Sequence, residues 1–226
     1  RKRNIEDELV NWELYKAYGH FNLCFESLIA TFRELLIDMV RLSYGFNVDW
    51  EDPDTEEPVD DYLQDRLLKI ILHDDGAFAI VEKSRSCFFD MTNKEFQKVL
   101  SDNDILPVLL PESILKTAEL IFKKSLELVK LRNIIIHSHY EGVVFNLMPV
   151  RNLMGKKHHK TAKGFEERKY ILTVDFLNKL IEQIEDLENL VQHLNYFVTI
   201  DIENNGFESD TDELLSKMKF SIPQHI

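Results

Sequence analysis

The chain has 226 residues, of which 44% are hydrophobic and 30% are charged, so it is long and apolar enough to bury a sizeable core. It contains only seven glycines and six prolines, which favours long amphipathic helices over a β protein with many turns. A net charge of −13 argues against a protein that coats nucleic acid with its whole surface.

The first half of the chain is predicted to be mainly helical. Residues 5–45 have helical periodicity, with Gly19 as a candidate break and Gly45 as the expected stop. Residues 60–73 predict a second helix after an acidic, proline-interrupted loop. Thr92 and Glu95 have capping-box spacing, which predicts that a short helix begins there.

The second half is predicted to centre on one long apolar helix. Pro111 is expected at its N-terminus, and the 29 residues that follow, through Tyr140, contain no glycine and no proline. Residues 143–150 and 169–174 are short and β-branched, so they predict the two strands of a hairpin with a basic loop between them. Asp175 is expected to cap the last long helix.

These elements predict an all-α fold in the main: a helical bundle with a long central helix and a small β-hairpin insertion before the last long helix. We expect a single domain over residues 1–200, with the hairpin and its basic loop at about 142–173. Residues 201–226 form an acidic C-terminal tail with a weak helical turn near its end.

Two apolar stripes run along the central helix on a 100° wheel. Their residues are Ile121, Leu128, Leu131 and Ile135 in one stripe and Phe122, Leu126, Val129 and Ile136 in the other. One stripe is expected to pack on the chain's own bundle and the other on a second copy, which gives a two-fold homodimer. The alternative is one large monomeric bundle that covers both stripes.

The end of the central helix carries a polar cluster of Arg132, Asn133, His137, His139 and Tyr140. Histidine can move protons to or from a ribose 2′-hydroxyl, and arginine can hold the charge that builds on phosphorus. Asparagine can orient either partner. No acidic cluster accompanies these residues, so we expect no metal site and no cofactor.

Residues 151–170 form a basic segment on an otherwise acidic chain, with seven Lys or Arg against two Glu. Such a segment can attract a polyanion at one place. The candidate RNA-binding residues are Arg151, Lys156, Lys157, Lys160 and Lys163. The alternative is a solvated loop without a ligand.

The sequence "RNIIIH" at the end of the central helix resembles the signature of HEPN domains (higher eukaryotes and prokaryotes nucleotide-binding). The resemblance implies a dimeric helical bundle and a metal-independent endoribonuclease that acts as a toxin or a phage-defence effector. Arg132, Asn133 and His137 would then be catalytic, with His139, Tyr140 and Glu26 as accessory residues. It also implies products with 2′,3′-cyclic phosphate ends, RNA as the partner molecule, and an antitoxin or defence-system partner protein.

Several alternatives stay open at this stage. His139 can replace His137 as the catalytic imidazole, because Arg132 and His139 also have a spacing that fits the signature. Tyr140 lies one position later than the tyrosine that one toxin subgroup modifies with AMP, so we do not expect that modification. The chain can also be a non-catalytic RNA-binding, nucleotide-binding or dimerisation module of a larger defence or signalling protein. In a purely structural bundle, Arg132 and His137 would interact only with the end of their helix.

The sequence predicts a cytoplasmic protein without a membrane span. Cys24 and Cys87 lie far apart and match no metal or redox spacing, so we expect reduced thiols. The longest apolar runs are too short to cross a bilayer, and the start lacks the apolar region of a signal peptide. Because residue 1 is Arg rather than Met, we expect the numbering to begin inside a longer natural chain.

Overall fold

The structure is a computed structural model that describes the backbone of residues 5–43, 75–93, 110–141, 152–161, 164–199, 207 and 210–221. Side chains are described over residues 12–40, 75–93, 110–138, 171–199, 207 and 210–221. The predicted helix over 60–73 and the predicted strand over 143–150 lie outside these residues.

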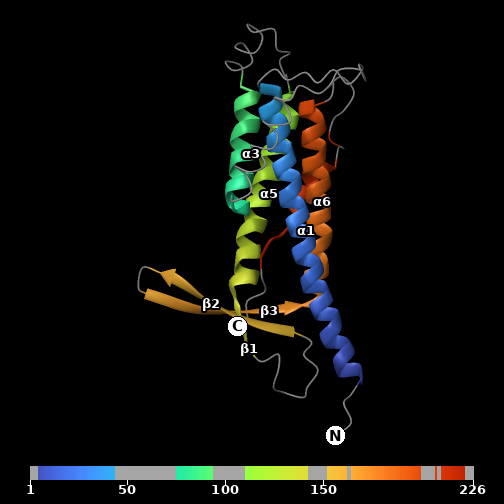
Figure 1. Cartoon of the computed structure of the whole chain (residues 1–226), viewed down its shortest axis with the longest axis vertical. Coiled ribbons are helices and arrows are strands. Elements are labelled where there is room, and N and C mark those ends of the chain that lie inside the picture. Colours follow the sequence, from blue (N-terminus) through green and yellow to red (C-terminus); the bar gives the residue numbers. More distant parts are fainter. Residues whose placement is uncertain are drawn as a thin grey trace, which may run out of the picture. The chain divides into compact units, whose positions relative to one another are not determined.

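The described part of the chain is mainly helical, as the sequence predicts (Figure 1). Its elements in chain order are α1 (Ile5–Ser43), α3 (Ala77–Met91), α5 (Glu112–His137), β1 (His139–Glu141), β2 (Asn152–Thr161), β3 (Gly164–Thr173), α6 (Val174–Thr199) and α7 (Thr211–Lys217). No helix among the described residues is long and apolar enough to cross a membrane.

The chain divides into two compact units. The first unit combines residues 1–27, 127–186 and 218–226, and the second unit combines residues 28–126 and 187–217. The first unit therefore contains the end of α5 and the whole β-sheet, which together hold the predicted polar cluster and the basic segment.

The second unit is built around phenylalanine side chains from three helices. The ring centroid of Phe122 lies 5.8 Å from those of Phe32 and Phe88, and 6.1 Å from that of Phe89. Phe32, Phe88 and Phe122 are fully buried. The buried hydroxyl of Ser84 lies 3.0 Å from the carbonyl oxygen of Phe32, so α3 meets α1 with this polar group satisfied.

The first unit buries apolar side chains from α1, α5 and α6. Phe21 and Phe25 on α1 are buried, as are Leu131 and Ile135 on α5. On α6, Leu180 is 1% exposed and continues this core. The two residues named on α1 and the two on α5 are each four positions apart, which places each pair on one face of its helix, the pattern that predicts amphipathic packing.

The two predicted stripes of the central helix differ in burial. Ile121, Leu128, Leu131 and Ile135 are all buried, which confirms that this stripe faces a core. In the other stripe Phe122 and Val129 are buried, whereas Leu126 and Ile136 are only half-buried. The homodimer along α5 stays a prediction.

The candidate break at Gly19 is absent from α1, and the predicted end of the central helix is wrong. Helix α1 continues through Gly19 without a break, because a single glycine costs a long helix only about 1 kcal/mol. Helix α5 ends at His137 instead of reaching Tyr140, and the chain enters β1 at His139. His139 and Tyr140 therefore do not belong to the central helix.

The basic segment is a pair of strands rather than the predicted loop. Strands β2 and β3 pair antiparallel from Asn152 opposite Thr173 to Thr161 opposite Gly164. The predicted strand over 169–174 is only the end of β3, and residue 174 already belongs to α6. Strands are predicted from alternating apolar and polar residues, a pattern that arises only where one face is buried. The lysine-rich part of β2 and β3 lacks this alternation and was therefore not predicted as strand.

The residues predicted as caps lie at helix ends in the structure. Thr92 is the C-cap of α3, and its hydroxyl donates to the carbonyl oxygen of Phe88 at 3.0 Å. The short helix predicted to begin at Thr92 lies, beyond residue 93, outside the described residues. At the start of α6 the backbone N–H of Phe176 donates to the hydroxyl of Thr173 at 3.1 Å, so Thr173 caps the helix and Asp175 lies in its first turn. Helix α7 confirms the weak helical turn predicted in the tail.

Candidate functional site

Arg132 is held against α1 by two side chains of the first unit. Its Nη2 donates to Oε1 of Glu26 at 3.1 Å, and its guanidinium carbon lies 5.1 Å from the centroid of the Phe25 ring. The Arg132 side chain is 24% exposed and that of Glu26 is 57% exposed. Among the described residues the buried Nε of Arg132 has no hydrogen-bond partner, and the guanidinium is held by the ion pair with Glu26 and the contact with the Phe25 ring.

Tyr18 belongs to the same surroundings of Arg132. Burial raises the pKa of the Tyr18 phenol above its ordinary value of 10.0, while a hydrogen bond to Asn22 and the positive charge of Arg132 act in the opposite direction. The phenol is therefore neutral near pH 7 and can act as a hydrogen-bond donor beside the guanidinium.

His137 is the last residue of α5, and its side chain is exposed. His137 lies five positions after Arg132 on the α-helix, which corresponds to about 140° around the axis and about 7.5 Å along it. The two side chains therefore leave the helix on different sides. Asn133 is half-buried and lies only about 40° from His137, so these two residues share a face.

The accessory residues His139 and Tyr140 lie on β1 rather than on α5. Strand β1 pairs antiparallel with β2, and the Cα partners of His139 and Tyr140 are Lys156 and Gly155. The chain thus passes within two residues from the exposed imidazole of His137 to β1, the strand that pairs with the basic strand β2. Glu26, the third accessory residue, contacts Arg132 as described above.

The register of β2 and β3 places basic residues opposite each other. Lys156 pairs with Lys169, and Lys157 pairs with Arg168. The next two pairs combine histidine with glutamate, at positions 158 with 167 and 159 with 166. Lys160 lies opposite Phe165.

Two of the predicted RNA-binding residues, Arg151 and Lys163, lie outside the described residues. Lys156, Lys157 and Lys160 all belong to β2, so the structure brings these three onto one strand. Among the predicted catalytic residues, it brings Asn133 and His137 to one face of α5 and directs Arg132 to another.

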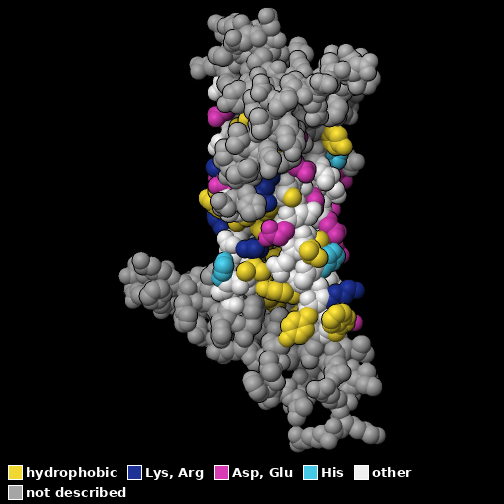
Figure 2. All heavy atoms as spheres, viewed as in Figure 1, with side chains coloured by type: hydrophobic (Ala, Val, Ile, Leu, Met, Phe, Trp, Pro, Cys, Tyr) yellow, Lys and Arg dark blue, Asp and Glu magenta, His cyan; other side chains and the backbone are white. Residues whose placement is uncertain are grey.

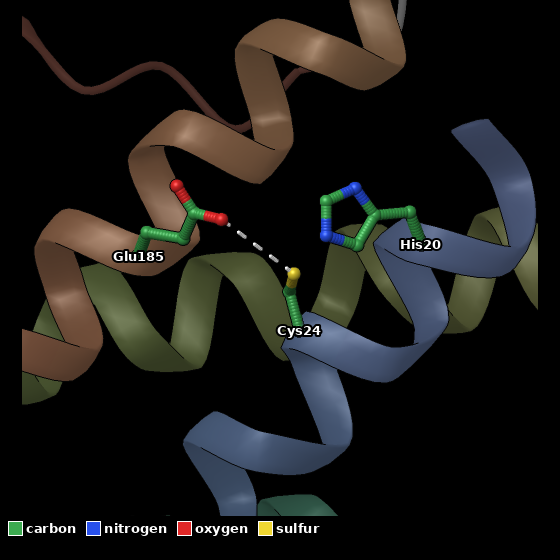
Figure 3. A group of neighbouring side chains, drawn as sticks. All are labelled: His20, Cys24 and Glu185. Carbon is green, nitrogen blue, oxygen red and sulfur yellow. Dashed lines mark hydrogen bonds between the residues drawn. The ribbon is translucent and has the colours of Figure 1, made fainter.

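One cluster was missed by sequence reasoning. The imidazole of His20, the thiol of Cys24 and the carboxylate of Glu185 point toward one another between α1 and α6 (Figure 3). His20 and Cys24 are four residues apart on one helix, which is a local signal for a shared face. Glu185 lies 161 positions after Cys24, and no sequence pattern connects it to this pair.

Charge and apolar groups are mixed on the described surface. Figure 2 shows hydrophobic side chains that reach the surface among acidic and basic ones. Three of the large exposed hydrophobic residues belong to α1: Trp12 is 67% exposed, Tyr15 50% and Leu23 71%. They fall within about 80° of the helix circumference, so they form an apolar stripe.

Comparisons of the chain with models of known families, with curated proteins and with solved structures found no match. The fold and the site therefore define a mainly helical protein. Its central helix ends in a polar cluster, and the chain continues from there into an antiparallel sheet with a basic strand. The HEPN resemblance of residues 132–137 stays a prediction.

Proposed function

We propose that this protein is an endoribonuclease of the HEPN type that cleaves RNA without a metal ion. The observation that carries the proposal is that an exposed histidine lies two residues before a strand that pairs with the lysine-rich strand β2. His137 ends α5, and two residues later His139 pairs with Lys156 on β2. A proton-transfer group beside a strand with unbalanced positive charge suits a phosphodiester polyanion.

His137 is the proposed base in this reaction. It removes the proton of a ribose 2′-hydroxyl, and the freed oxygen attacks the adjacent phosphorus while the bond to the 5′-oxygen breaks. A second histidine, either His139 or His137 of a second copy, acts as an imidazolium and gives its proton to the leaving 5′-oxygen. The products are a 2′,3′-cyclic phosphate and a 5′-hydroxyl, so atoms and charges balance without an external reactant.

Arg132 is the proposed electrostatic group. Its guanidinium has five N–H donors, and the contact with Glu26 uses Nη2. Because Arg132 and His137 lie about 140° apart on α5, we propose that a complete site combines Arg132 of one copy with His137 of the other. Asn133, on the same face as His137, orients the imidazole or the phosphate.

A homodimer is therefore part of the proposal. The apolar stripe of Trp12, Tyr15 and Leu23 supports it, since isolated proteins rarely expose several large apolar side chains on one helix face. The proposed biological role, toxin or phage-defence effector with an antitoxin or defence-system partner, follows from the HEPN resemblance alone. RNA contacts are assigned to Lys156, Lys157 and Lys160 with Arg151 and Lys163.

The second candidate is a HEPN-like module that binds RNA or a nucleotide, or dimerises, without catalysis. The engagement of Arg132 by Glu26 and Phe25 favours it, because an arginine already neutralised by a carboxylate stabilises phosphorane charge less. This module would belong to a larger defence or signalling protein. It predicts retention of RNA without turnover.

A comparison of two oligonucleotides separates the candidates. The purified chain is incubated in EDTA with an RNA oligonucleotide and with the same sequence in which every 2′-hydroxyl is replaced by hydrogen. The nuclease cleaves only the RNA and leaves cyclic phosphate ends, whereas the binding module retains both and cleaves neither. Cleavage of the deoxy analogue would contradict 2′-hydroxyl attack.

A further inference from the structure

The cluster of His20, Cys24 and Glu185 contains donor groups of three kinds. His20 and Cys24 lie one turn apart on α1, and Glu185 comes from α6 within the same unit. One ligand atom from each residue lies within 4.8 Å of the other two. The thiol of Cys24 lies 4.0 Å from Oε1 of Glu185, at hydrogen-bonding distance for sulfur.

We propose that these three residues bind a zinc ion. Ligand atoms around tetrahedral zinc lie about 3.5 Å apart, because the bonds to nitrogen, oxygen and sulfur measure about 2.0 to 2.3 Å. Closing the observed cluster to this size takes rotamer adjustments of about 1 Å, and two of the three side chains are exposed and free to make them. The spacing of His20 and Cys24 is also the four-residue spacing with which paired helix ligands hold zinc.

The donor set selects the metal. Magnesium and calcium require oxygen ligands, so a thiolate and an imidazole exclude them as preferred ions. Nitrogen, sulfur and one carboxylate oxygen are the three ligand types of protein zinc sites. Since His20 and Glu185 are exposed and Cys24 is half-buried, solvent reaches the site and water takes the fourth position.

Binding replaces one proton by the ion. The Cys24 thiol loses its proton to solvent and forms the bond to zinc as a thiolate, and the hydrogen bond from sulfur to Glu185 becomes two bonds to the metal. No oxidation or reduction takes place. The enthalpy of binding therefore depends on the buffer that takes up the proton.

The zinc ion would tie α1 to α6 on the side of α1 opposite to Arg132. Cys24 and Glu26 are two positions apart, which places them about 160° apart around the helix. Glu26 contacts Arg132 of α5 on one side, and Cys24 would be held to Glu185 of α6 on the other. The ion thus serves to fix α1 in the first unit, and its site is separate from the proposed catalytic residues.

The test uses the full chain, freed of metal and kept reduced without a chelating thiol. Zinc chloride is titrated by calorimetry, and cobalt(II) is then used as an absorbing substitute that reports thiolate coordination. We expect one ion per chain, a thiolate-to-cobalt absorption band, and an affinity that falls on the order of tenfold or more in Cys24→Ser. Cys87→Ser, which removes the other cysteine, is the matched control and retains binding and the band.

Two further variants keep the result interpretable. His20→Ala removes an exposed ligand, so it is expected to fold even if Cys24→Ser does not, and it should also lose affinity. Glu185→Gln keeps the size of the side chain and should weaken binding. The proposal is overturned if the wild type binds no stoichiometric zinc, or if Cys24→Ser and Cys87→Ser bind alike. RNA cleavage is measured separately and does not enter this result.

Discussion

The ion pair between Glu26 and Arg132 makes a measurable contribution to stability, and a double-mutant cycle isolates it. Glu26→Gln removes the negative charge, and Arg132→Met removes the positive charge while it keeps an apolar stem. The two charged atoms are 3.1 Å apart, and the side chains are 57% and 24% exposed. Exposed pairs contribute about 0.2–1 kcal/mol, and the burial of Arg132 places this pair near the upper end, at about 1 kcal/mol. That corresponds to about a fivefold change in the folding equilibrium.

Urea denaturation followed by circular dichroism measures the unfolding free energy of the wild type, both single variants and the double variant. The coupling energy should fall when salt is raised to about 1 M, where the Debye length is about 3 Å. The contact of Arg132 with the Phe25 ring is unaffected by Glu26→Gln and cancels in the cycle. A coupling energy within error of zero would refute the reasoning that Glu26 fixes the guanidinium.

The chain offers a matched control pair in the second unit. Arg85 donates to Glu119 through Nη2 at 2.7 Å and through Nε at 3.3 Å, with side chains 38% and 47% exposed. The hydrogen bond to Glu119 raises the pKa of Arg85 above its ordinary value. Arg85→Met and Glu119→Gln should couple by about 0.5–1 kcal/mol and leave RNA cleavage unchanged. The cycle at Arg132 should change both stability and cleavage.

Two further predictions concern stability. Phe122→Ala should lower the unfolding free energy by about 3–5 kcal/mol in a denaturant titration, because the ring is fully buried against Phe32 and Phe88, whereas Phe122→Leu should cost clearly less. Equal losses would argue against this packing. Burial, with a smaller effect of Asp90, raises the pKa of Cys87 above its ordinary value of 9.0. The Cys87 thiol therefore keeps its proton to a higher pH in the folded chain than in the unfolded chain. The resulting stabilisation is complete below about pH 9, and it is lost as the pH rises through the raised pKa of the folded chain. Urea midpoints at about pH 8 and about pH 10 should differ more for the wild type than for Cys87→Ala, and an unchanged difference would contradict the assignment.

The sequence predicts the long helices well because their signal is local. Residues 112–137 carry apolar residues at helical spacing after Pro111, and the structure places α5 there. The end of α5 could not be predicted, since no glycine or proline separates His137 from Tyr140. Directly after the helix, His139 pairs with Lys156 of β2, and this non-local pairing leaves no signal in the local sequence of α5.

The candidate site was only partly predictable for the same reason. Arg132 and His137 are found from spacing, but the contact of Arg132 with Glu26 joins residues 106 positions apart. It was expected only from the HEPN resemblance. The basic segment was recognised from its charge, whereas its strands were missed because charged residues on both faces give no alternation. The third ligand of the proposed zinc site, Glu185, likewise depends on the fold.

The central claim is that the exposed imidazole of His137 cleaves RNA. The most direct measurement compares cleavage of total RNA in EDTA by the wild type, His137→Ala and His193→Ala. His193 is an exposed histidine of α6 in the second unit, so its variant removes an equivalent side chain outside the unit that holds the proposed site. The account predicts cleavage by the wild type and by His193→Ala, and a loss of at least about a hundredfold in folded His137→Ala. Equal cleavage by all three proteins, or by none of them, would contradict it.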